Sequence, residues 1–264
     1  MKNKINEYRS FRKDKLLVNI YYETNEVGIV AAFFVANELN SAINLKGSAN
    51  LILPAGASQV LFLTHLQQQK IDWDKITVFH LDEYKGMPET HPASFRKYLK
   101  EKILDEVRPG KVYCIKGDAP DVESELSRYE NLLRKHPIDV ACIGIGENGH
   151  IAFNDPPKAD FNDPKLVKVV ELDEICRKHQ LGEGWFSSLQ DVTKEALTLT
   201  IPAIMSSKTI SCVVPDERKA QAVFNTLNLE ITTACPATIL RMHSHAILHL
   251  DLLSSGLLPQ VNNN

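Results

Sequence analysis

The sequence predicts an α/β fold built on a single, mostly parallel, doubly wound sheet with helices on both faces. Short apolar runs alternate with longer amphipathic stretches along the chain, which is the order expected of strand–helix–strand units. The apolar runs end in clusters of Gly, Pro or acidic residues, as buried strands often do. No segment rich in Pro, Gly and Ser divides the chain, so we expect residues 1–264 to form one domain.

The element boundaries follow from the same patterns. Strands are predicted at 48–56, 76–84, 138–146, 209–215 and 245–251. Apolar residues at helical spacing predict helices at 26–39, 59–69, 94–104, 122–133 and 219–227. We expect residues 1–20 to be an N-terminal extension and residues 256–264 to be a frayed tail. Parallel sheets of this type bind ligands beyond the carboxyl ends of their strands, and the motifs described below lie at such ends.

Composition and charge exclude several classes of protein. The chain has 264 residues, with 30 Lys and Arg against 33 Asp and Glu. Apolar residues make up 44%, which is typical of a globular protein rather than a disordered one. The formal charge of −3 disfavours nucleic acid as a partner. The longest early apolar stretch, 27–36, is too short to span a bilayer, so no membrane partner is expected. The five cysteines form no CxxC pair, which favours a reducing cytoplasm and disfavours disulfides or a zinc site.

Two segments are candidates for binding a phosphate group. In LPAGAS (53–58), a strand runs into Ala55, Gly56, Ala57 and Ser58 before a helix starts. The backbone amides of such a turn, with the serine hydroxyl, can cradle an anion; an ordinary strand–helix turn is the alternative. In DERKAQAV (216–223), Lys219 lies near a helix N-terminus. A cation is unfavourable there unless an anion is bound, although a surface lysine would have the same spacing.

The segment HLDEYKG (80–86) places two acids directly after a buried strand. Neighbouring side chains on an extended backbone point in opposite directions. We therefore expect one of Asp82 and Glu83 to face the ligand crevice and the other to face helices or to cap one. A carboxylate at the end of a strand is well placed to act as a general base, although a loop acid or a helix cap is the simpler explanation for either residue alone.

The segment GIGENGHIAFNDPP (144–157) combines glycines with polar side chains after another buried strand. Its glycines, including Gly149, permit a close approach of the backbone and positive φ angles. His150 has Asn148 before it and Asp155 after it. A histidine flanked by an amide and a carboxylate can act as an oriented acid/base group. The glycine spacing does not match a dinucleotide-binding fingerprint, so a nucleotide cofactor is not expected.

These segments, in this order, resemble the glucosamine-6-phosphate deaminase/isomerase family, which is related to the 6-phosphogluconolactonases. The resemblance covers about residues 25–251, and its specific parts are DEYKGMPETHPASF (82–95) and GHIAFNDP (149–156). It implies a modified Rossmann-like sheet. It also implies conversion of an amino-sugar 6-phosphate and water into a ketose 6-phosphate and ammonia, without metal or organic cofactor. The sugar phosphate is the expected partner, and the family leaves a homo-oligomer open.

The resemblance also implies roles for individual residues. His150 would assist opening of the sugar ring, and Asp82 would carry a proton between C2 and C1. Asn148 and Asp155 would support His150. Residues Ala55, Gly56, Ala57, Ser58, Glu83, Gly149 and Lys219 would bind the substrate, with Lys219 and the 55–58 turn holding its phosphate.

This chain departs from the family pattern at several of these positions. Asn148 replaces a common Asp, and Asp155 replaces a common Glu. Ala55 stands where a threonine is common. An arginine usual before two aromatic residues is absent, because Gly184 precedes Trp185 and Phe186; Arg177, Lys178 or Arg218 could substitute for it. Two alternatives therefore remain open: hydrolysis of a phosphosugar lactone, and binding of a sugar phosphate without catalysis.

Overall fold

A computed structural model describes residues 7–156 and 158–259. Its main sheet has eight strands in the order β1-β2-β11-β10-β7-β3-β4-β6. All neighbouring pairs in it are parallel except β1 and β2. The strands are β1 (Glu7–Lys13), β2 (Leu16–Tyr21), β3 (Ala49–Leu53), β4 (Ile76–His80), β6 (Lys111–Tyr113), β7 (Val140–Ile143), β10 (Thr209–Val214) and β11 (Ala246–Asp251).

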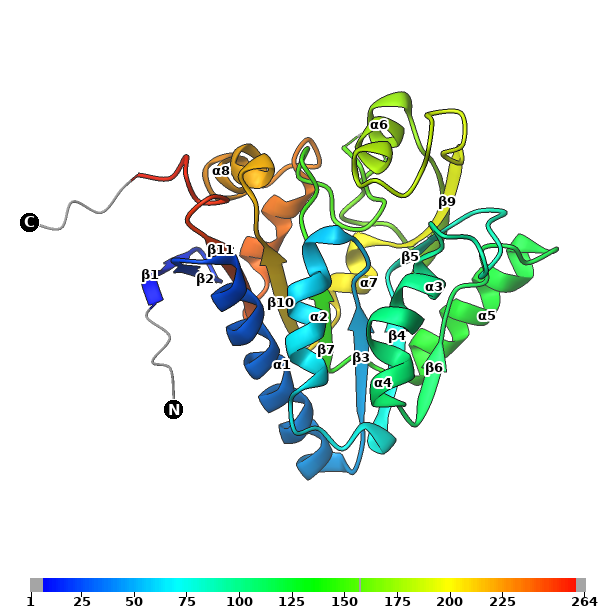
Figure 1. The fold of residues 1–264 in the computed structure, drawn as a ribbon, viewed down its shortest axis with the longest axis horizontal. Coiled ribbons are helices and arrows are strands. Elements are labelled where there is room, and N and C mark those ends of the chain that lie inside the picture. The colour runs from blue at the N-terminus through cyan, green and yellow to red at the C-terminus, as the bar shows by residue number, and fades with distance from the viewer. Residues whose placement is uncertain (1–6, 157, 260–264) are drawn as a thin grey trace, which may run out of the picture.

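Helices cover both faces of this sheet, as the sequence predicts (Figure 1). On one face, α1 (Thr24–Lys46), α2 (Val60–Gln67) and α3 (Phe95–Leu99) share a core with β3 and β4. On the other face, α5 (Val122–Lys135), α7 (Ile201–Met205) and α8 (Ala220–Asn228) pack with β7, β10 and β11. The fold is therefore the doubly wound α/β arrangement expected from the alternation of strands and helices.

Helix α1 is long and apolar enough to cross a membrane by length and composition. Its residues Val27, Ala31, Val35 and Leu39 are buried. They lie in one apolar cluster with strands β3 and β4 and helix α2. The helix starts with a capping box made by Glu23 and Glu26 and ends at Gly47 in the left-handed conformation. This packing explains the apolar composition of α1 as that of a core helix.

A second sheet lies beside the carboxyl ends of the main strands. It has three antiparallel strands in the order β5-β9-β8, formed by β5 (Asp82–Tyr84), β9 (Glu195–Leu199) and β8 (Val167–Glu171). Helix α6 (Glu174–Gly182) packs with this sheet through an aromatic-rich cluster that includes Tyr84 and Phe153. In Figure 1, α6 and β9 stand above the parallel strands.

The structure differs from the sequence prediction at the N-terminal segment. Residues 7–21 are not an extension, because β1 and β2 form a hairpin that joins the main sheet through β11. The hairpin turns at Asp14, which has a φ angle of 51°. The turn contains no glycine, so the amino-acid sequence did not indicate a hairpin here.

Two other boundaries also differ. The apolar run at 76–84 is two strands, β4 and β5, which belong to different sheets and are separated by Leu81. Residues 256–259 of the expected frayed tail are tied to the body of the protein, since Leu258 is buried and the Pro259 carbonyl accepts a hydrogen bond from Arg9. The rest of that expected tail lies outside the described residues.

Several shorter helical elements complete the described fold. The predicted helix at 94–104 is α3 followed by a π-helical turn at Lys100–Leu104 and by α4 (Asp105–Val107). 3₁₀ helices occur at η1 (Ala57–Gln59), η2 (Trp73–Lys75), η4 (Glu217–Lys219) and η5 (Pro236–Met242). Of these, η1 and η4 directly follow β3 and β10 and precede α2 and α8.

The order of strands fixes where a ligand crevice can form. From β3 the chain proceeds to β4 and β6 on one side, then returns to place β7, β10 and β11 on the other side. The connections after β3 and β7 therefore diverge, and parallel sheets bind ligands at such a switch point. The segments 54–58 and 144–150 both begin there.

Candidate active site

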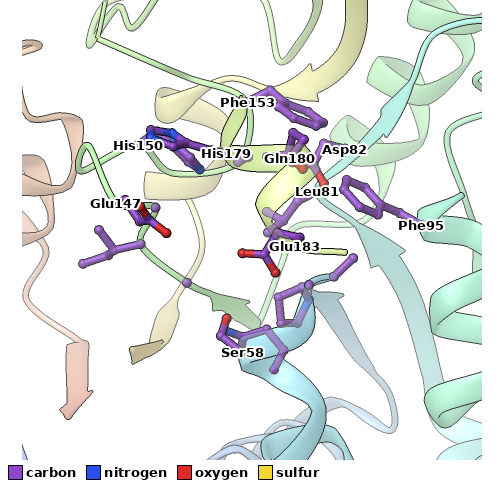
Figure 2. Close-up of a pocket in the computed structure, with 18 of the residues that line it drawn as sticks. Ser58, Leu81, Asp82, Phe95, Glu147, His150, Phe153, His179, Gln180 and Glu183 are labelled. Atoms are coloured by element: carbon purple, nitrogen blue, oxygen red, sulfur yellow. The ribbon is translucent and has the colours of Figure 1, made fainter. Parts of the chain in front are cut away.

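A pocket opens at this switch point. Its lining comes from the ends of β3, β4, β7 and β10 and from α6. Figure 2 shows Asp82 and His150 pointing into it from different sides. The residues that line it include Ala55, Gly56, Ser58, Gln59, Asp82, Gly146, Glu147, His150, His179, Gln180, Glu183, Trp185 and Lys219.

The two acids that follow β4 point in different directions, as expected. Asp82 lines the pocket. The carboxylate of Glu83 is fully buried and accepts hydrogen bonds from the backbone N–H groups of Phe95 and Arg96, at 3.1 and 3.0 Å, and from the Ser94 hydroxyl at 2.8 Å. These groups form the N-terminus of α3. The structure therefore does not place Glu83 in the pocket, where a substrate-binding role would require it, but beneath it as a helix anchor.

Asp82 has an environment that favours its neutral form. Its side chain is 7% exposed and has no hydrogen bond or ion pair within the described part of the chain. Burial, together with the smaller effect of the nearby Glu83 charge, raises the pKa of Asp82 to about 8. A carboxyl group with a pKa close to neutral can both release and accept a proton under ordinary conditions.

His150 is held by two side chains from its own loop. Its Nδ1 lies 2.7 Å from Asn148 Oδ1 and 3.2 Å from Asp155 Oδ1. The Asn148 amide also donates to Asp155 Oδ1 at 2.8 Å. Both neighbouring oxygens can accept a hydrogen bond from Nδ1–H, which would leave Nε2 for exchange with a ligand. The predicted grouping of His150, Asn148 and Asp155 is therefore present, although Asn148 and Asp155 stand behind the ring rather than in the pocket wall.

Asp155 remains ionised although it is buried. Burial alone would raise its pKa, but the hydrogen bond to His150, the charge of His150, and hydrogen bonds from Asn148 and the Cys176 thiol hold the pKa of Asp155 below its usual range. Asp82 and Asp155 thus have pKa values displaced in opposite directions. Such a separation is typical of sites that use one carboxyl as a proton carrier and another as a fixed charge.

The glycines of the 144–149 segment make room for this arrangement. A Cβ atom on Gly146 would lie 2.0 Å from the His150 ring, so only glycine lets the ring lie against the backbone there. Gly149 has a φ angle of +85°, and a Cβ atom on it would lie 2.5 Å from the Cys235 sulfur. Gly149 therefore shapes the loop and does not itself line the pocket.

The opposite wall of the pocket carries groups suited to an anion. Ala55, Gly56 and Ser58 line it after β3, while the backbone N–H of Ala57 points to the Glu183 carboxylate at 3.2 Å. Lys219, at the end of η4, is only 7% exposed and lines the same wall. Within the described residues its ammonium group has no hydrogen bond and no ion pair. Burial lowers the pKa of Lys219, and the charges of Glu183 and Glu147 oppose that effect.

None of the three cations considered as substitutes for the absent arginine lines the pocket. Arg177 donates to the backbone carbonyls of Val192 and Leu189. Lys178 pairs with Glu174 on the exposed side of α6. Arg218 is bound by Asp216 at 3.0 Å and lies 3.7 Å from Glu147.

The sequence analysis did not assign several residues of the pocket to the site, and four of these come from one segment: His179, Gln180, Glu183 and Trp185. All belong to α6 or to the turn that follows it. Gln180 accepts a hydrogen bond from the Tyr84 hydroxyl at 2.6 Å, which ties α6 to β5. Helix α6 is amphipathic, and its polar residues alone gave no sign of facing a cavity. The amino-acid sequence contains one indication that this segment contributes to the site, which is that Gly184 stands where the family pattern has an arginine.

Comparison with known proteins gives the family. Residues 23–248 match the family of glucosamine-6-phosphate isomerases and 6-phosphogluconolactonases. The chain belongs to this family. The match begins two residues after β2, so the N-terminal hairpin precedes it.

Individual relatives narrow the position of the chain within the family. A glucosamine-6-phosphate deaminase of an Exiguobacterium species is 38% identical over 213 residues, which cover 81% of this chain and 82% of that protein. One from Bacillus cereus is 33% identical over 81% of this chain and 79% of its own length. Among solved structures, a monomeric glucosamine-6-phosphate deaminase superposes with a TM-score of 0.83, at 30% identity, over 91% of this chain and 99% of that one.

The lactonase branch is similar in fold. A 6-phosphogluconolactonase from Shewanella baltica superposes with a TM-score of 0.72 over 89% of this chain and 96% of its own, at 17% identity. That likeness concerns the arrangement of strands and helices.

Proposed function

We propose that the protein deaminates and isomerises glucosamine 6-phosphate, giving fructose 6-phosphate and ammonia. The observation that carries the proposal is the placing of Asp82, with its raised pKa, and the supported His150 on one pocket with the buried Lys219. The deaminases that are 33–38% identical over four fifths of the chain support the same reaction.

The proposed reaction uses protons and one water molecule. His150 moves a proton to the ring oxygen, and the sugar opens to its 2-amino aldehyde. Ionised Asp82 takes the proton from C2, and O1 is protonated to give an enol that carries the amino group at C2. Asp82 then returns the proton to C1, which turns the C–N bond into an imine. Water adds to C2, and ammonia leaves to give the ketose.

The phosphate would be held at the other wall. The amides of the 55–58 turn and the ammonium of Lys219 offer donors of the kind that phosphate oxygens accept. Ser58 can add its hydroxyl. Asn148 and Asp155 would keep the His150 ring oriented.

The reaction itself is tested by analysing products. Purified protein incubated with glucosamine 6-phosphate should release ammonia and fructose 6-phosphate in equal amounts. N-acetylglucosamine 6-phosphate, whose nitrogen is acylated, is the matched control and should give neither. Absence of both products from glucosamine 6-phosphate would refute the proposed reaction.

We further propose that the protein works in the cytoplasm. All five cysteines are free thiols, and four of them are buried, which fits a reducing compartment. Assembly into a homo-oligomer stays a prediction, and sedimentation of the purified protein would test it.

A further inference from the structure

Glu183 lies where the substrate phosphate is expected. Its Oε2 accepts the backbone N–H of Ala57 at 3.2 Å, and its side chain lines the pocket together with Gly56, Ser58 and Lys219. Figure 2 shows its carboxylate directed into the pocket near Ser58. The Glu183 carboxylate thus accepts a hydrogen bond from a backbone N–H group that the proposed function assigns to the substrate phosphate.

The same wall also carries a cation that Glu183 does not pair with. Lys219 as a residue is more than nine-tenths buried, and its ammonium group has no ion pair or hydrogen bond in the described ranges. Glu183 raises the pKa of Lys219 through its charge, so the two groups sense each other without direct contact. The carboxylate therefore occupies the cradle only in part.

A phosphate and this carboxylate cannot share the site at low cost. Both would need the Ala57 amide, and two anions a few ångströms apart repel strongly where water is partly excluded. Arg177 is bound to backbone carbonyls, Lys178 to Glu174 and Arg218 to Asp216, which leaves Lys219 as the nearby cation that can offset this repulsion.

We propose that Glu183 determines the affinity for the substrate by acting as an internal competitor for its phosphate group. The carboxylate accepts from the 55–58 turn when the pocket is empty, and a phosphate must displace it to bind. This inference rests on the proposed function for the identity of the substrate, but the competition itself concerns any phosphate that enters the cradle.

The test is calorimetric titration with inorganic phosphate. Glu183→Gln keeps the size of the side chain and removes its charge. We expect it to bind phosphate about tenfold more tightly than the parent, since hydrogen bonds to charged groups are worth at least that factor. Glu174→Gln is the matched control, because it removes the same charge from the exposed side of the same helix; its affinity should equal that of the parent.

A second variant and a kinetic measurement make the test complete. Glu183→Ala removes the carboxylate altogether and should also bind phosphate more tightly than the parent. In turnover of glucosamine 6-phosphate, both Glu183 variants should show a lower KM. Unchanged or weaker phosphate binding in both variants would overturn the inference, as would a raised KM, which would mean that Glu183 itself binds the substrate.

Failure of the proposed function would look different. If the parent releases no ammonia but the Glu183 variants bind phosphate more tightly, the inference holds and the proposed reaction is wrong. If ammonia is released and the variants bind phosphate no better than the parent, the reaction stands and the inference is wrong.

Discussion

Asp82 and Asp155 show how the surroundings of a residue decide its chemistry. Both are carboxyl groups with less than a tenth of their surface exposed. Asp155 accepts from Asn148 and Cys176 and faces His150, so its charge is stabilised. Asp82 has no such donors, and burial therefore raises its pKa to about 8. One aspartate can exchange a proton near neutral pH, while the other stays ionised.

The raised pKa of Asp82 predicts the pH dependence of the reaction. Only the ionised carboxyl can take a proton from C2, so kcat/KM should fall as the pH drops below about 8, by tenfold per pH unit. A pH profile of kcat/KM measures this limb. A profile that stays flat down to pH 5 would show that Asp82 is not the base or that its pKa is ordinary.

The same shift predicts a dependence of stability on pH. The pKa of Asp82 is higher in the folded protein than in the unfolded chain, so the folded state binds one more proton between about pH 4 and pH 8. The stability gained from neutral Asp82 is complete at low pH and is lost as the pH rises through about 8.

A variant isolates this contribution. Asp82→Asn cannot ionise, so its melting temperature should rise relative to that of the parent as the pH increases from 5 to 9. We expect a gain of several degrees at pH 9. Calorimetric melts at the two pH values test it, and an equal offset at both would contradict the assignment.

At the scale of elements, Glu83 connects the strand that carries Asp82 to helix α3. The Glu83 carboxylate joins β5 to the N-terminus of α3 through donors from Ser94, Phe95 and Arg96. An ion pair at 3.2 Å between Arg96 Nε and Glu83 adds to these contacts. Asp82 directly precedes Glu83 in the chain, so the position of the Asp82 side chain depends on the contacts that hold Glu83.

Breaking the anchor should destabilise the protein. Glu83→Gln replaces one acceptor oxygen with an NH2 group that cannot accept, and it removes the charge that pairs with the buried Arg96, which keeps its ion pair with Asp118. We expect the free energy of unfolding to fall by about 3 kcal/mol, measured by urea denaturation. Glu195→Gln serves as the control, because it removes a half-exposed carboxylate of β9 that is paired with Lys85, and it should cost less than about 1 kcal/mol.

The elements also show what the sequence could predict. The buried strands β3, β7, β10 and β11 are continuous apolar runs, and the structure confirms all four within two or three residues of their predicted bounds. The second sheet escaped prediction because β5 is three residues long and follows β4 after a single residue, so the two strands read as one. The opposite orientation of Asp82 and Glu83 was predicted correctly, since it follows from the geometry of an extended backbone.

The pocket residues on α6 could not be predicted in the same way. Glu183 and His179 reach the site because the antiparallel sheet places α6 over the ends of the parallel strands. That placement depends on long-range packing through Tyr84, Phe153 and Cys176. Local spacing carries no information about such contacts.

At the scale of the whole molecule, topology brings the site together. The chain reverses direction across the sheet after β6, so the segments after β3 and β7 separate and leave a crevice between them. Residues more than 60 positions apart, such as Asp82 and His150, thereby face one pocket. The prediction of a strand-end site was possible because every motif stood at the end of a parallel strand.

The central claim of this account is that Asp82 carries the proton during turnover of glucosamine 6-phosphate. The most direct test is the rate of ammonia release by Asp82→Asn beside Asp72→Asn, an exposed aspartate paired with Lys75 far from the pocket lining. A positioned proton carrier contributes about 10²-fold or more to the rate. We predict a loss of at least about 10²-fold for Asp82→Asn and parental turnover for Asp72→Asn. Near-parental ammonia release by Asp82→Asn would contradict the account.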